Sequence, residues 1–209
     1  MASIEQIRVG SLNGFLNRRV DTETLPWTVD ECDQAIKQAL LETWPTLGIF
    51  VSGTVATNQN SPYYVIPASI EIVSRIVLEQ VSAGVTAKVA EVPAWTPHVA
   101  GQVAIEPQLP TDTTLSLRFY GWKPYADDAD DLPDRLMSLV AMKAASLAYG
   151  MLGAKLADSE DQMALDSGKV ITQADAVGLS AYWQRRFEDV LRSTPNQLSR
   201  APRAASRGR

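Results

Sequence analysis

The hydrophobic period changes twice along the chain, and this constrains the fold more than any other feature. Apolar side chains recur at helical spacing in residues 28–44, and they do so again after residue 131. Between them, residues 48–122 consist of short runs rich in Val, Ile, Thr and Tyr, separated by Gly, Pro, Asn and Ser. Too little helix lies between these runs for parallel βαβ units. The pattern predicts an α+β fold.

The same pattern predicts how the chain is organised. We expect a helical core, made by an N-terminal helix and a C-terminal helix pair, with an inserted antiparallel β subdomain and an extended C-terminal arm. The core would take residues 1–47 and 123–194, the β subdomain residues 48–122, and the basic arm residues 195–209. A length of 209 residues suits one domain with an embedded subdomain.

The first strong helix is predicted over residues 28–44. Thr28 followed by Glu31 is a capping box at its start, and Pro45 stops it. Residues 1–20 give a weaker helical pattern, which Gly14 interrupts.

Six strands are expected in the central region. In the third, one set of side chains alternates with Glu71, Val73, Arg75 and Val77, namely Ile70, Ile72, Ser74, Ile76 and Leu78. The six expected strands are residues 48–57, 62–67, 70–80, 84–92, 98–107 and 113–122.

A long helix is predicted over residues 132–166, continuing towards Gly168. Asp131 with Asp134 would cap it, and Pro133 suits a first turn. A last helix over residues 172–192 begins with Thr172 and Asp175. The expected apolar positions of the long helix are Leu132, Leu136, Leu139, Val140, Leu147 and Met151, interleaved with small residues that allow another helix to approach.

Charge is unevenly distributed along the chain. The formal net charge is −5, yet residues 192–209 contain five arginines and no acid, which leaves about −10 on the rest. An acidic cluster, Asp127, Asp128, Asp130, Asp131 and Asp134, precedes the long helix. An acidic body repels nucleic acid, whereas the arginines of the arm could bind phosphates or carboxylates. A solvated tail and a partner-binding arm both remain open.

The sequence does not favour catalysis, and we predict no catalytic, cofactor-binding or metal-binding residues. His98 is the one histidine and lies at the entry to a strand, where a residue without a special role is expected. Cys32 lies on the apolar side of its helix, which favours a buried hydrophobe over a nucleophile. The acidic cluster lacks the spacing of a calcium-binding loop, so a solvated turn is expected there. PYYVIP (62–67) can be explained by core packing or a subunit interface.

The N-terminus, MASIEQIRVG, has no basic region followed by an apolar run, and no run of about 18 uninterrupted apolar residues occurs. A soluble protein without a membrane partner is expected.

The order of these features resembles the head-to-tail adaptor (connector) proteins of tailed bacteriophages. The resemblance covers residues 28–192 as a pattern of elements. It rests on the early amphipathic helix, YYVIPASIEIVSRIVLE, the strand and acidic turn of TTLSLRFYGWKPYADDADDLP, the Ala-rich LPDRLMSLVAMKAASLAYGML, and YWQRRFEDVLR in the last helix. The β region here is longer and more regular than in the mostly helical adaptors.

This resemblance implies a structural virion protein of the neck, made in the cytoplasm of a bacterial host. It would form a ring of identical subunits, typically twelve, below the portal protein. The ring would extend the DNA channel, contact the passing DNA weakly and without sequence specificity, and dock the next tail or stopper protein. We expect the arm to bind the portal through Leu198, Arg200, Arg203, Arg207 and Arg209. A small DNA-binding or packaging component is the alternative, and an enzyme that uses His98 or the aspartates is a third hypothesis.

Overall fold

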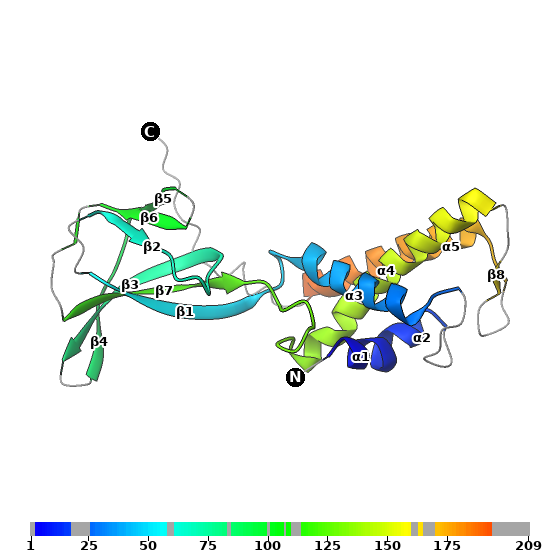
Figure 1. Ribbon diagram of the computed structural model, residues 1–209, viewed down its shortest axis with the longest axis horizontal. Helices are drawn as coiled ribbons and strands as arrows, with labels where there is room; N and C mark the ends of the chain where they lie inside the picture. The colour runs from blue at the N-terminus through cyan, green and yellow to red at the C-terminus, as the bar shows by residue number, and fades with distance from the viewer. Residues whose placement is uncertain are drawn as a thin grey trace. The chain divides into compact units, whose positions relative to one another are not determined.

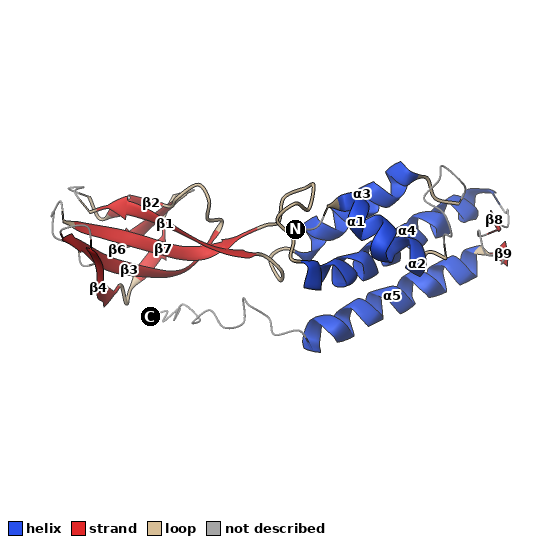
Figure 2. Ribbon diagram, turned by 90° about the horizontal axis from the view of Figure 1, so that it is seen from below, coloured by secondary structure: helices blue, strands red, loops and turns tan. Residues whose placement is uncertain are grey.

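The computed structural model confirms an α+β fold in which two small antiparallel sheets are inserted between α3 and α4. It describes residues 3–17, 26–57, 61–82, 85–99, 101–106, 108–109, 114–159, 163–164 and 170–193. The chain divides into two units. The helical unit joins Met1–Leu47 to Tyr125–Asn196, and the β unit contains Gly48–Pro124. Figures 1 and 2 show helices in one unit and the long strands in the other.

The helical unit is built around α4 (Asp134–Ser159). On α4 pack α3 (Val29–Thr43), α5 (Gln173–Ser193) and the N-terminal segment, which consists of α1 (Ile4–Ile7), a π-helical turn η1 (Arg8–Leu12) and α2 (Asn13–Phe15). The N-terminal segment stays helical through Gly14, so the predicted interruption there is wrong.

Capping boxes start two of these helices. The Thr28 side chain accepts a hydrogen bond from the Glu31 N–H, and the Glu31 carboxylate accepts one from the Thr28 N–H, as predicted for α3. Thr172 and Asp175 make the same exchange before α5, which confirms the predicted start of the last helix. Such pairs satisfy N–H groups that have no partner within the helix.

Small side chains let α4 and α5 approach each other closely. A Cβ added at Gly153 would lie 3.3 Å from Val177 Cγ2. The Ser146 hydroxyl lies 3.0 Å from the Ser180 carbonyl, and the Ser180 hydroxyl lies 2.8 Å from the Ser146 carbonyl. The two hydroxyls therefore tie the helix backbones together at this contact.

Aromatic side chains connect α4 to the N-terminal part of the unit. The indole N–H of Trp27 donates a hydrogen bond to the Ala148 carbonyl at 3.1 Å, and the ring meets Tyr149 edge to face at 5.0 Å. The Tyr149 hydroxyl donates to the Phe15 carbonyl at 3.3 Å. α4 is thus the central helix of the unit, with buried residues on several of its faces.

The β unit contains a large and a small sheet, both antiparallel. The large sheet has the strand order β1 (Ile49–Ala56), β7 (Leu115–Lys123), β3 (Ile72–Ser82), β4 (Val85–Glu91). The small sheet has the order β2 (Tyr63–Val65), β6 (Gln102–Ile105), β5 (Trp95–Pro97). One core joins them, formed by the buried residues Tyr64, Ile70, Ile76, Val92, Val103, Ile105, Leu117 and Phe119.

An irregularity in β3 changes the predicted alternation. The register with β7 shifts between Val73 and Arg75, which leaves Ser74 as an extra residue whose hydroxyl donates to the Tyr120 carbonyl at 3.0 Å. This β-bulge moves side chains before and after it to different faces. Ile76 is therefore buried, whereas Ile72, four residues earlier, is 39 % exposed, so the regular alternation predicted from Ile70 to Leu78 is wrong.

Two further expectations are corrected. α4 ends at Ser159, and β8 (Met163–Ala164) pairs with β9 (Val170–Ile171), so the predicted continuation of the helix to residue 166 is wrong. β5 is a strand that the sequence did not predict. α4 begins at Asp134, directly after Pro133, and the Asp131 carboxylate accepts a hydrogen bond from the Ala126 N–H at 2.8 Å.

Candidate functional site

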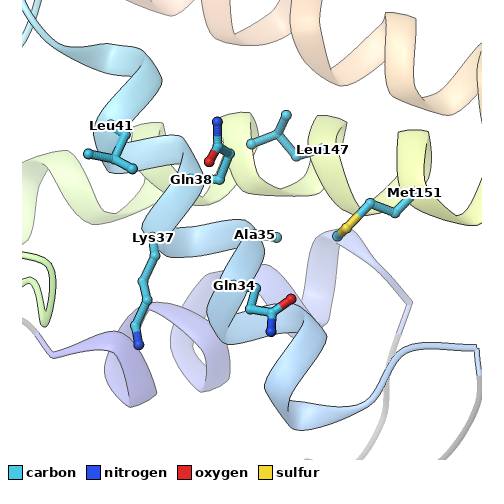
Figure 3. Close-up of a pocket in the computed structure, with 7 residues that line it drawn as sticks. All are labelled: Gln34, Ala35, Lys37, Gln38, Leu41, Leu147 and Met151. Atoms are coloured by element: carbon cyan, nitrogen blue, oxygen red, sulfur yellow. The ribbon is translucent and has the colours of Figure 1, made fainter.

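A groove between α3 and α4 has a volume of about 440 Å³ (Figure 3). Leu147 and Met151 lie one turn apart on α4 and line it, and Leu41 of α3 stands at one end, 58 % exposed. Gln34, Lys37 and Gln38 of α3 contribute polar groups to the lining of the groove. In Figure 3 the Lys37 side chain points away from α4.

Two of the apolar positions expected on α4 lie at this groove. Leu147 is half-buried and Met151 is exposed. Tyr149 and Leu152 are buried instead. The groove thus exposes apolar side chains, without a cluster of ionisable groups that could perform chemistry on a substrate.

Two ion pairs fix α3 against α4 beside the groove. Lys155 pairs with Glu31 at one end, and at the other Lys143 Nζ lies 2.7 Å from a Glu42 carboxylate oxygen. The hydrogen bond from Lys143 is the main cause that lowers the pKa of Glu42 below its ordinary value of 4.5. Burial raises the pKa of Glu31, but the hydrogen bonds from Lys155 and Thr28 and the Lys155 charge outweigh it, so this pKa is lowered as well. Both carboxylates are therefore held ionised by their partners.

The outer face of the large sheet carries a cluster of aromatic side chains and an arginine. Phe50 stacks on Tyr120 at 6.0 Å between ring centroids and meets Trp122 edge to face at 5.0 Å. The Arg75 guanidinium lies 4.5 Å above the Tyr120 ring. Phe50 and Ile72 are exposed at the margin of this cluster. The sequence analysis missed this surface, because only the pairing of β1 and β3 with β7 brings these residues together.

The acidic cluster is a turn. Asp127, Asp128 and Asp130 are exposed, and the Asp128 carboxylate accepts a hydrogen bond from the Asp130 N–H at 3.3 Å. Within the described ranges, no group of three or more His, Cys, Asp or Glu residues is arranged to hold a metal ion.

The remaining candidate residues belong to different segments of the chain. Cys32 is fully buried in α3. His98 is exposed and stacks on Tyr63 at 4.1 Å between ring centroids. Tyr64 is buried in the β core, and burial raises the pKa of its hydroxyl. The arm residues Leu198, Arg200, Arg203, Arg207 and Arg209 lie outside the described residues.

One helix in the described part of the chain, α4, is long and apolar enough to cross a membrane by length and composition. Of the most apolar 18-residue window within Asp134–Ala157, 61 % is buried inside the structure, as is typical of the core helix of a folded unit.

Comparisons with protein-family models and with curated proteins found no match to this chain.

Proposed function

We propose that this protein is a structural component of a bacteriophage virion: a head-to-tail adaptor that forms a ring below the portal, extends the DNA channel and docks the next tail protein. The phage role rests on the resemblance in the order of elements. The observation that carries an assembly function is that both units expose apolar side chains on formed surfaces.

Both units carry neighbouring apolar side chains that are exposed. The helical unit exposes Leu41 and Met151 at its groove, and the β unit exposes Phe50 and Ile72, which pair with Trp122 from its two sides in the large sheet. Single exposed apolar residues are common, but grouped ones mark interaction sites. Subunits of a ring need such contacts on two sides, because each copy touches two neighbours.

The C-terminal arm is proposed to dock the ring onto the portal. Pro195 to Arg209 is 15 residues, which span about 50 Å when extended. Leu198 is the sizeable apolar side chain of this segment, and its arginines offer paired hydrogen bonds to carboxylates. Opposite charge on a portal groove would speed the encounter, and ordering of the arm would hold the ring in place.

Co-sedimentation with purified portal tests this function. The full chain is expected to form a ring of defined mass that sediments with the portal, visible by negative-stain electron microscopy. Deletion of residues 195–209 should leave the melting temperature nearly unchanged and abolish stable association with the portal. Substitution of Arg200, Arg203, Arg207 and Arg209 by Gln, with the arm retained, is the matched control for charge.

The competing DNA-binding function predicts a different outcome. It requires that the deletion removes a salt-sensitive affinity for DNA and spares association with the portal. Full-strength sedimentation of the truncated protein with the portal would contradict the docking arm, and a full-length protein that stays monomeric with and without the portal would contradict the ring.

A further inference from the structure

The two edge strands of the large sheet, β1 and β4, run in opposite directions. β1 pairs with β7 alone and β4 with β3 alone among the described strands. Each neighbouring pair in the order β1, β7, β3, β4 is antiparallel, so β1 and β4 point in opposite directions. A second copy placed beside the first by simple repetition would therefore continue the antiparallel alternation, with its β1 next to β4 of the first.

The backbone of β1 offers a regular row of hydrogen-bonding groups at its open edge. The Thr57 N–H donates to the Leu115 carbonyl, which makes this a hydrogen-bonded pair, and such pairs alternate along antiparallel strands. The N–H and C=O groups of Phe50, Ser52 and Thr54 consequently point away from β7. Unpaired groups in such a row are a template for another strand.

β1 lacks the features that keep an edge strand unpaired. Its sequence, IFVSGTVA, contains no charged residue and no proline, and its eight pairs with β7 show no shift of register. Proteins commonly protect their edges with lysine, proline, bulges or very short strands. The small sheet is protected by length, because its edge strands β2 and β5 have three residues each.

β4 carries a β-bulge at Val89, where its register with β3 shifts, so the regular segment Val85–Lys88 is the part of this edge suited to pair. Every described side chain from Thr86 to Glu91 is exposed, and Val89 is 52 % exposed. Figure 1 shows the position of β4 within the sheet. The positive charge of Lys88 would discourage pairing with another strand if no acidic group lay near it. Its ammonium group, however, lies 3.5 Å from the Glu91 carboxylate. The described part of this edge thus meets the uncharged β1 without repulsion.

We infer that β4 of one copy pairs with β1 of the next, so that the large sheets of neighbouring copies join edge to edge. This inference deepens the proposed function, on whose ring of identical subunits it rests. A head-to-tail contact of this kind uses two different surfaces of each copy and closes into a ring when the rotation between copies allows. The occupant of each edge is a second copy of this chain.

Cysteine cross-linking of the full chain tests the pairing. Thr54 and Thr86 lie on the same face of the large sheet, at its two opposite edges. The proteins compared are Thr54→Cys, Thr86→Cys, the double variant, and the unmodified chain, whose buried Cys32 is the control for background reaction. After treatment with a short bismaleimide, the double variant is expected to give a ladder of multiples of the chain mass, and each single variant only monomer.

The other outcomes overturn the inference. A dimer from Thr54→Cys alone would show that β1 pairs with β1 about a two-fold axis, and a dimer from Thr86→Cys alone would show the same for β4. A ring of defined mass by native mass spectrometry, without cross-links in the double variant, would refute the edge pairing and leave the proposed function standing. No assembly by either method would refute both.

A second pair of variants tests the hydrogen bonds. Thr54→Pro removes an N–H that points away from β7, whereas Thr54→Val keeps it and has nearly the same shape. Loss of one hydrogen bond is expected to weaken self-association about tenfold in Thr54→Pro relative to Thr54→Val. Equal association of two folded variants, checked by far-UV circular dichroism, would contradict the pairing.

Discussion

Gly121→Ala is expected to destabilise the β unit strongly, because strand β3 lies where the methyl group would be. A Cβ at position 121 would lie 2.2 Å from the Ile72 carbonyl oxygen and 2.5 Å from Ile70 Cγ2. Gly121 pairs with Val51 on one side and Val73 on the other, so β7 cannot move without disturbing both neighbours. The nearest atom belongs to the backbone, and rotation of a side chain cannot relieve the contact.

The size of the effect follows from this geometry. Overpacking by a methyl group costs about 1–3 kcal/mol, and a fixed backbone obstacle places this substitution near 3 kcal/mol. In a unit of this size, about 3 kcal/mol corresponds to a fall of roughly 15 °C in the melting temperature. Differential scanning calorimetry measures the shift, and far-UV circular dichroism assigns it to loss of β structure.

Gly150→Ala is the matched control, with the opposite expected sign. The Cβ would lie 3.6 Å from the Ser180 hydroxyl oxygen, an ordinary contact, and alanine is favoured over glycine inside a helix by about 1 kcal/mol. This variant should match or exceed the wild-type melting temperature. If Gly121→Ala is as stable as the wild type, or if both variants lose stability equally, the close approach of β3 to β7 is refuted.

Three further predictions concern the helical unit. Thr28→Ala should lower the free energy of unfolding by about 1 kcal/mol through loss of the α3 cap, and Thr28→Ser should restore it, as measured by urea denaturation. The pKa of Glu42 is lowered in the folded state, so its ion pair with Lys143 contributes stability above pH 4.5. This stability is lost as the pH falls through the folded pKa. Glu42→Gln should therefore show a smaller fall of the melting temperature with decreasing pH than the wild type, in a series of melting temperatures measured across this range. Asp131→Ala should cost about 1 kcal/mol through its lost hydrogen bond to the Ala126 N–H, Asp131→Asn should cost less, and millimolar calcium should not raise either melting temperature.

The sequence predicted those elements whose signals are local. The pairs Thr28–Glu31 and Thr172–Asp175 each lie within one turn of helix, so residue types and spacing suffice to identify them. The change from helical to alternating hydrophobic period and back is also read from neighbouring residues, and it predicted the inserted antiparallel sheets. Features that depend on distant partners were not predictable in this way. The bulge at Ser74 is one of these, because its hydroxyl binds the Tyr120 carbonyl, 46 residues further along the chain.

The buried faces of α4 could not be predicted from its pattern. Apolar and small residues surround this helix on nearly all sides, so helical spacing fits several faces equally well. Tyr149 packs against Trp27 and is buried, whereas Met151, two residues later, is exposed at the groove. The position of α3 and α5 on α4 decides between these faces, and that position is a tertiary property.

The same limit applies to the strand edges that carry the inferred ring contact. Strands that follow each other in sequence often pair, yet β1 pairs with β7, which lies some 60 residues away, and β2 joins another sheet. The sequence of β1 therefore identifies a strand but not an edge, and only the strand order shows that Ser52 and Thr54 direct their backbone groups outward. Because those groups bind nothing else among the described strands, a substitution such as Thr54→Pro removes no hydrogen bond within the sheet. A change at this edge should accordingly separate self-association from folding, which a change at the buried Phe119 or at Gly121 cannot do.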